Sequence, residues 1–256
     1  MASDFRARLR NRETLLGTML TLPVPAVAEI LADAAFDWLF IDAEHGPLET
    51  SDLLSILQSV DRRIPCVVRV PRADEVAIKK ALDLGAAGVI VPQVNTAAQA
   101  RDVVRFARYA PEGARGVGLA RAHGYGFRFK EYVESANACT AVIVQAEHFE
   151  AVENIEAIVR VEGVDAVFLG PYDLAASLGK MGEVEAPEVI DAIAHVTSTC
   201  RAAAMPLGYF GVTADAVRPY IERGYTLVVA GVDTLFLGNA ARQLREELTA
   251  VAGRGR

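Results

Sequence analysis

The chain has 256 residues, of which 52% are hydrophobic and 23% charged, and this composition is typical of a globular protein and excludes a disordered one. Its formal net charge of −7 argues against general binding of nucleic acid or of anionic membranes. An anionic substrate would therefore need a local positive charge, such as an arginine, a metal ion or a helix N-terminus.

The cysteines Cys66, Cys139 and Cys200 are far apart, odd in number and in no CxxC arrangement, so we expect them to be reduced. The longest run without a charged residue, 84–100, contains a proline and several polar residues and does not read as a membrane span. The first residues lack the apolar segment of a secretory signal. These features predict a cytoplasmic protein with no membrane partner.

Short apolar runs alternate with helical patterns along the whole chain. Most of the runs are continuously apolar, as in strands that are buried on both faces of a parallel sheet. The expected strands are 15–20, 38–42, 66–70, 88–92, 141–147, 166–170, 205–210 and 226–231. Helix-length segments separate them: Ser51 and Asp52 are expected to cap a helix over 53–60, and Thr213 with Asp215 to open the next-to-last helix.

Eight strand–helix repeats fit either a closed (β/α)8 barrel or an open doubly wound sheet. About 250 residues is the usual size of the barrel. Residues 20–27 after the first strand contain no glycine-rich turn, which disfavours a dinucleotide-binding sheet. We therefore predict one (β/α)8 domain over 1–256 with a disordered tail from about 252. The irregular stretch 111–132 is long for a connection, and such loops are often functional.

Polar residues cluster where the expected strands end, the edge at which barrel enzymes carry their active sites. They are Asp42, Glu44, His45, Arg69, Gln93, Gln145, Glu147, His148, Tyr172 and Asp173. Glu147 and Asp173 follow adjacent strands, so one hard cation such as Mg²⁺ or Mn²⁺ could bind both carboxylates. The alternative is that each acid only begins the following helix.

Histidine is the side chain best suited to act as a general base near neutral pH, so His45 would serve in that role, although a lone strand-end histidine is more often structural. Arg69 ends a buried run and needs an anionic partner. That partner is either Asp42 or Glu44, or a substrate carboxylate or enolate. Asp83 ends a helix and by its pattern alone is a surface acid.

Eight segments in order resemble the HpcH/HpaI aldolase family, the metal- and pyruvate-dependent class II aldolases, over about residues 14–248. They include FDWLFIDAEHGPLE (36–49), IKKALDLGAAGVIVPQV (78–94), VIVQAE (142–147) and GVDAVFLGPYDLAASLG (163–179). The resemblance implies a (β/α)8 barrel whose last helix is exchanged between subunits of a hexamer, a trimer of dimers.

The resemblance also implies roles for individual residues. Glu147 and Asp173 would bind Mg²⁺, Mn²⁺ or Co²⁺, with no organic cofactor. His45 would be the base, Asp83 the acid that raises its basicity, and Asp42 a further member of the catalytic group. Arg69 would bind substrate and stabilise its enolate, while Gln145 and the backbone at Tyr172 would contact pyruvate.

The implied reaction is the reversible cleavage of a 4-hydroxy-2-oxo acid to pyruvate, or a related 2-oxo acid, and an aldehyde through a metal-stabilised enolate. The four lysines all fall in expected helices or loops, which disfavours a Schiff-base enzyme. His148, Tyr172 and Ala175 depart from the family pattern and leave the aldehyde preference open. Two other functions remain open: an acyl-CoA thioester lyase of the citryl- or malyl-CoA type, and a metal-binding barrel without catalysis.

Overall fold

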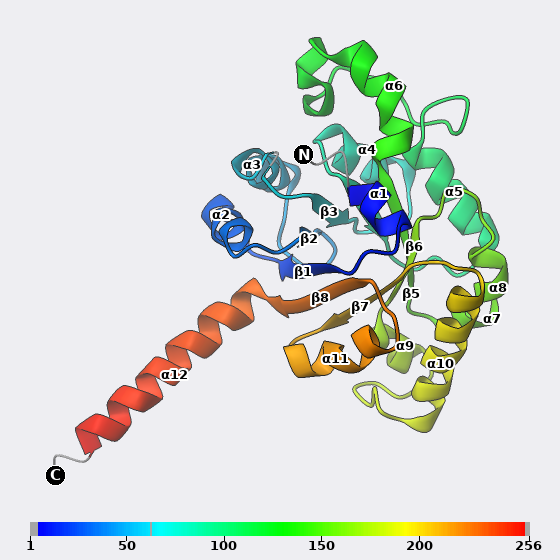
Figure 1. Cartoon of the computed structure of the whole chain (residues 1–256). Coiled ribbons are helices and arrows are strands. Elements are labelled where there is room, and N and C mark those ends of the chain that lie inside the picture. Colours follow the sequence, from blue (N-terminus) through cyan, green and yellow to red (C-terminus); the bar gives the residue numbers. More distant parts are fainter. Residues whose placement is uncertain (1–4, 62, 254–256) are drawn as a thin grey trace.

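The computed structural model describes residues 5–61 and 63–253 and shows a closed barrel of eight parallel strands in sequential order, β1 pairing with both β2 and β8 (Figure 1). The (β/α)8 prediction is confirmed. The strands are β1 (Leu15–Leu20), β2 (Trp38–Asp42), β3 (Cys66–Arg69), β4 (Gly88–Val91), β5 (Ala141–Ala146), β6 (Ala166–Leu169), β7 (Leu207–Gly211) and β8 (Leu227–Val232).

Helices connect the strands on the outside of the barrel. They are α1 (Phe5–Arg10), α2 (Pro25–Asp33), α3 (Thr50–Ser59), α4 (Glu75–Asp83), α5 (Ala97–Ala107), α6 (Phe129–Cys139), α7 (Phe149–Glu153), α8 (Ile155–Ile158), α9 (Pro171–Ser177), α10 (Pro187–Ala202), α11 (Ala214–Glu222) and α12 (Asp233–Gly253), with a 3₁₀ helix η2 (Arg121–Gly126). Within the described residues no helix is long and apolar enough to cross a membrane.

Alternate residues of each strand form two separate cores. In each strand every second side chain faces the helices, and the side chains between them fill the inside of the barrel. Inside the barrel, Phe40 packs between Trp38 and Phe168. These large rings fit because glycines face them: a Cβ on Gly17 would lie 2.6 Å from the Trp38 ring, and one on Gly208 would lie 2.2 Å from Phe168. The barrel is therefore a packed core and not a pore.

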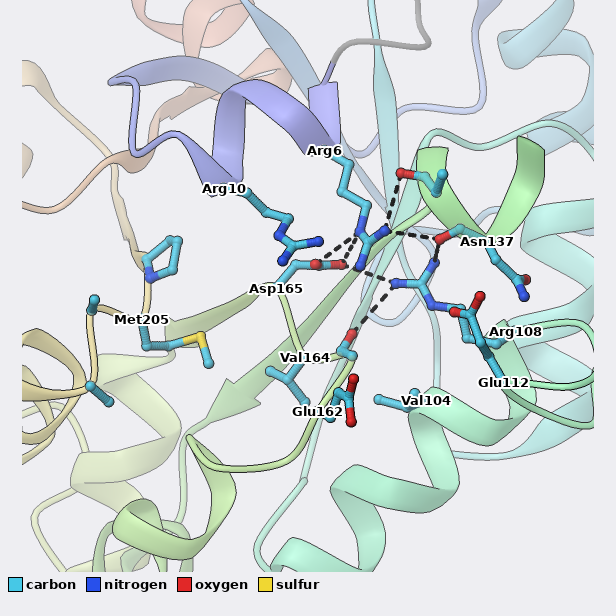
Figure 2. Close-up of a pocket in the computed structure, with 15 residues that line it drawn as sticks. Arg6, Arg10, Val104, Arg108, Glu112, Asn137, Glu162, Val164, Asp165 and Met205 are labelled. Atoms are coloured by element: carbon cyan, nitrogen blue, oxygen red, sulfur yellow. Dashed lines mark hydrogen bonds and ion pairs between the residues drawn. The ribbon is translucent and has the colours of Figure 1, made fainter. Parts of the chain in front are cut away.

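Helix α1 closes the amino-terminal end of the barrel. Its Phe5 and Leu9 join the interior core, and its Arg6 donates to both carboxylate oxygens of Asp165 at 2.9 Å. Asp165 also pairs with Arg108 at 3.2 Å and accepts from the backbone N–H of Val142 at 2.9 Å. Figure 2 shows the guanidinium groups of Arg6 and Arg108 turned toward Asp165. These residues line a cavity of about 710 Å³. Because these polar groups bond to one another, we assign the cluster to stability.

Three local expectations were wrong. Helix α3 begins at Thr50 instead of residue 53, and Asp52 stabilises its start by accepting from Glu49 N at 2.9 Å. The stretch 111–132 is not irregular throughout, since it holds η2 and the start of α6. A disordered tail was expected from about residue 252, but α12 continues to Gly253; the rest of the expected tail, residues 254–256, lies outside the described part.

Helix α12 projects away from the barrel instead of packing along it (Figure 1). Phe236, Leu237, Leu244, Leu248 and Val251 are all exposed on it. Its first residue holds it firmly, because the Asp233 carboxylate accepts from Thr21 N and Leu22 N, at 2.9 and 2.8 Å, and from Thr21 Oγ1. The helix is thus held at Asp233, and its apolar residues from Phe236 onward are exposed to solvent.

Candidate active site

The candidate site is the last layer of the barrel interior, at the carboxyl ends of the strands. The inward parity that places Trp38 and Phe40 inside the barrel continues to Asp42, and the same alternation brings Arg69 and Gln145 inward. These three side chains, with His45, Tyr172 and Asp173, line a cavity of about 380 Å³. One cavity therefore contains six of the residues that the sequence singled out.

Arg69 is held by acids on two sides. Its Nε and Nη2 donate to the two oxygens of Asp42 at 2.9 and 2.7 Å, and Nη1 lies 3.2 Å from Glu44 Oε2. Burial lowers the pKa of this arginine, which is 7% exposed, but the Asp42 hydrogen bonds and the charges of Asp42 and Glu44 outweigh burial and raise it. The guanidinium also lies over the Phe40 ring. Both acids that the sequence offered as partners therefore bind this arginine.

Glu147 is almost fully buried, with 2% of its surface exposed. Its Oε1 accepts from the backbone N–H and the side-chain amide of Gln93, at 2.8 and 3.1 Å, and its Oε2 accepts from Gln145 Nε2. Burial raises the pKa of Glu147 to about 7; Gln93 opposes the shift, and the negative charges of Glu44 and Asp173 add to it. The carboxylate is thus oriented by amides, and the nearby positive charge of Arg69 only partly offsets its burial.

Gly170 makes this arrangement possible. A Cβ at this position would lie 2.8 Å from Glu147 Oε2 and 2.9 Å from Gln145 Nε2, closer than real Cβ contacts. Any larger residue would push both side chains out of place. A glycine directly before α9 therefore serves the Glu147 carboxylate, and not only the turn.

His45 and Asp173 lie at the open side of the cavity, and both are exposed. His45 follows β2 in a turn, and its Nε2 lies 3.8 Å from Glu44 Oε2. Glu44 therefore faces both Arg69 and His45, a link that the sequence reading did not make. Asp173 stands in the first turn of α9, where the helix N-terminus favours a negative charge.

Asp83 does not join this group within one chain. It ends α4, the helix that leads back to the amino-terminal end of the barrel, and it accepts from Arg115 Nη2 at 2.7 Å. Its expected action on His45 stays a prediction that this chain alone does not explain. His148, another of the polar residues at strand ends, caps α7 from the position before it, where its Nδ1 accepts from Glu150 N at 3.3 Å.

Gln93 is the site residue whose role sequence reasoning missed. It lies in the loop after β4 in a left-handed backbone conformation, with a φ of 55° that is uncommon for a residue other than glycine. This conformation is the one in which both its N–H and its side-chain amide reach Glu147. The sequence showed that Gln93 follows an expected strand, but it did not predict the backbone angle that brings both amide groups to Glu147.

The oxygen donors of the site fit a hard divalent cation. Glu147 and Asp173 are close enough for Asp173 to raise the pKa of Glu147, and Gln145 Oε1 is buried without a hydrogen-bond partner. Two carboxylates leave coordination positions for water and substrate oxygens, as Mg²⁺ and Mn²⁺ require. Among residues 5–61 and 63–253, no three His, Cys, Asp or Glu side chains form a metal site by themselves.

Comparison with known proteins agrees with this geometry. The model of the HpcH/HpaI aldolase/citrate lyase family matches residues 17–240, most of the chain. The chain belongs to this family. The curated relatives of this HpcH/HpaI chain include a 4-hydroxy-2-oxovalerate aldolase of Rhodococcus jostii, 42% identical over 98% of this chain and 97% of the relative.

Two further matches extend the comparison. A hydroxypyruvate/pyruvate aldolase of Cupriavidus necator is 41% identical over 94% of this HpcH/HpaI chain and 91% of the relative. The crystal structure of an HpcH/HpaI aldolase/citrate lyase family protein from Burkholderia cenocepacia superimposes with a TM-score of 0.93 at 38% identity. It covers 96% of this chain and 99% of that one. Relatives of nearly equal length therefore share both the sequence and the barrel.

Proposed function

We propose that the protein is a divalent-metal-dependent aldolase that reversibly cleaves a 4-hydroxy-2-oxo acid to pyruvate, or a related 2-oxo acid, and an aldehyde. The observation that carries this proposal is the single cavity on which His45, Arg69, Gln145 and Asp173 converge, with Glu147 buried behind them. The names of the relatives, aldolases of 4-hydroxy-2-oxovalerate and of hydroxypyruvate or pyruvate, support the same reaction.

In this proposal Glu147 and Asp173 hold the metal ion, Mg²⁺, Mn²⁺ or Co²⁺. When bound, the ion supplies Lewis acidity that makes the C3 proton of pyruvate easier to remove. Gln93 and Gln145 keep Glu147 oriented toward the site. Amides around a ligating carboxylate fix its direction without adding charge.

The chain's own groups then move the proton and stabilise charge. His45 removes a proton from C3 of pyruvate, and the electron pair remaining on C3 is delocalised as the enolate. Arg69 donates hydrogen bonds to the enolate oxygen, and Asp42 holds the guanidinium plane in position. C3 then bonds to the aldehyde carbon, and His45 returns its proton to the new alkoxide oxygen. Cleavage is the same sequence in reverse.

Exchange of the pyruvate methyl protons in D₂O tests the role of His45, because it needs the base but no aldehyde. We expect His45→Ala to lose exchange measured by proton NMR while still binding Mn²⁺ and pyruvate, since His45 is not a metal ligand in this proposal. His195→Ala is the matched control, because His195 is exposed on α10. Unchanged exchange in His45→Ala would assign the base to another residue. Pyruvate release without CoA separates the aldolase from an acyl-CoA lyase.

We further infer that the chain forms a homo-oligomer, a hexamer built as a trimer of dimers in which α12 packs against a neighbouring copy. The exposed apolar face of α12 supports this inference. A cytoplasmic location is also proposed, and the three free cysteines support it.

A further inference from the structure

The candidate active-site cavity has two chemically different walls. The polar wall is the part of the lining that comprises Asp42, Arg69, Gln145 and Asp173, on β2, β3, β5 and the start of α9. The apolar wall is the part that includes Met19 from β1, Phe210 from β7 and the Pro171–Tyr172 pair of α9. The polar wall carries the groups that the proposed function assigns to pyruvate and the metal. The apolar wall is left for the other substrate.

The cavity is larger than pyruvate needs. Pyruvate has six heavy atoms and fills roughly 100 Å³, about three times the volume of one water molecule. The cavity measures about 380 Å³. More than half of it therefore remains for a second molecule against the apolar wall.

The charges at this cavity disfavour a second anion. Arg69 is its only lining lysine or arginine among the described residues, and Asp42 and Glu44 already pair with its guanidinium. Asp173 adds negative charge at the opening. In the proposed function pyruvate engages both Arg69 and the metal held by Glu147 and Asp173. A carboxylate on the aldehyde would then find no further lysine or arginine among the described lining residues, and an unpaired charge in such a site is costly.

Tyr172 separates this cavity from a neighbouring one. The second cavity, about 350 Å³, lies between α9, α10 and α11 and shares Pro171, Tyr172 and Phe210 with the first. Its floor carries Tyr209 and Tyr220, whose rings stack at 3.4 Å. Tyr172 lines both cavities and is 51% exposed, so a substitution there would change the boundary between them without opening the core.

We propose that Tyr172 limits the length of the aldehyde, so that the site accepts a short, uncharged aldehyde and excludes longer and carboxylated ones. The proposal rests on the proposed function. The Tyr172 ring ends the apolar wall, and beyond it the second cavity holds space that the substrate does not reach. Removing the ring joins the two cavities.

The test compares kcat/KM for pyruvate addition to acetaldehyde, pentanal, 3-phenylpropanal and 4-oxobutanoate. The wild type should prefer acetaldehyde to 3-phenylpropanal by about tenfold or more, the scale on which a pocket discriminates by size. It should use pentanal about tenfold better than 4-oxobutanoate, which is similar in length but charged. Tyr172→Ala should reduce the preference for acetaldehyde over 3-phenylpropanal by about tenfold.

Two variants serve as controls. Tyr172→Phe keeps the ring and should keep the wild-type preference, and Tyr125→Ala removes the other exposed tyrosine of the described residues, which lines neither cavity. An unchanged preference in Tyr172→Ala, or better use of 4-oxobutanoate than of pentanal by the wild type, overturns the proposal. Pyruvate exchange in D₂O without aldehyde tests the proposed function separately: a wild type that exchanges but shows no length preference refutes only the role of Tyr172.

Discussion

Arg69 and Glu147 are buried charges, and each depends on partners that the fold brings from distant parts of the chain. Arg69 meets Asp42 from the neighbouring strand at matched register, since Asp42 pairs with Arg69 across β2 and β3. Glu147 meets Gln93 from the loop after β4. In both cases the charged residue lies at or just after the end of one strand, and its partner lies at or after the end of the adjacent strand.

Replacing Arg69 by Lys keeps the charge but loses the planar group that bonds to both oxygens of Asp42. We expect kcat/KM to fall about 100-fold or more, as when an oxyanion donor is removed. Steady-state kinetics with the fold checked by circular dichroism measure this. A variant retaining more than half of the wild-type rate would show that Arg69 is structural.

The pKa of Glu147 predicts how pH acts on metal binding. Because this pKa is raised to about 7, a proton competes with the metal below pH 7, and the apparent affinity for Mn²⁺ should rise about tenfold per pH unit before levelling off above it. Calorimetric titrations between about pH 5.5 and about pH 8 measure this dependence. A flat affinity below pH 7 would contradict the assignment.

The same shift sets the stability of the metal-free protein. A raised folded-state pKa favours the protonated folded form, so the contribution of Glu147 to stability is full below the ordinary glutamate value of 4.5 and is lost as pH rises from there through 7. Thermal unfolding without metal should show this fall. In Glu147→Gln, which cannot titrate there, the fall should be smaller.

Strands were predicted more accurately than helix ends. The apolar runs located every strand of the barrel, and 15–20 and 38–42 match β1 and β2 in full. The start of α3 was misplaced because Asp52 lies inside the first turn and accepts a hydrogen bond from the backbone N–H of Glu49, which precedes the helix. In the sequence, an aspartate at this position looks like the residue that comes before a helix. Thr213 was correctly predicted to cap α11, where it accepts from Ala216 N at 3.2 Å.

The site was predictable only in part. Position at the ends of the expected strands identified Asp42, Arg69 and Gln145 as candidates, and the alternation of each strand turns all three inward. The left-handed backbone of Gln93 and the position of Glu44 between Arg69 and His45 depend on loop conformation, which no periodicity encodes. Asp83 was assigned a role only by the family resemblance, and that role stays a prediction; in this chain its carboxylate pairs with Arg115.

Helix α1 is attached to the barrel by the Asp165 cluster, and its contribution is measurable. Asp165→Asn removes the charge that faces Arg6 and Arg108, of which Arg108 is 1% exposed, and should lower the free energy of unfolding by about 3 kcal/mol. Urea unfolding at constant m-value reports this change. Asp215→Asn, which breaks an exposed pair with Arg218, is the control and should cost less than about 1 kcal/mol. Equal losses in the two variants would contradict the assignment.

At the scale of the whole molecule, the exposed apolar residues of α12 predict assembly. Leu237, Leu244, Leu248 and Val251 recur at spacings that place them on one helix face. The double variant Leu244→Glu with Leu248→Glu should reduce the mass measured by light scattering. Gln243→Glu adds charge on the same helix and should leave the mass unchanged. If the double variant keeps the wild-type mass, assembly does not depend on this face.

The attachment of α12 also links this helix to the active-site cavity. Asp233 ties the root of the helix to Thr21 and Leu22, directly after the strand that supplies Met19 to the apolar wall. A neighbouring copy that binds α12 would therefore act, through Asp233, on the loop at Thr21 and Leu22 beside the apolar wall. Assembly through α12 and the shape of the substrate cavity then depend on the same contacts. Turnover per subunit should therefore decline when the enzyme is diluted far enough to separate its copies.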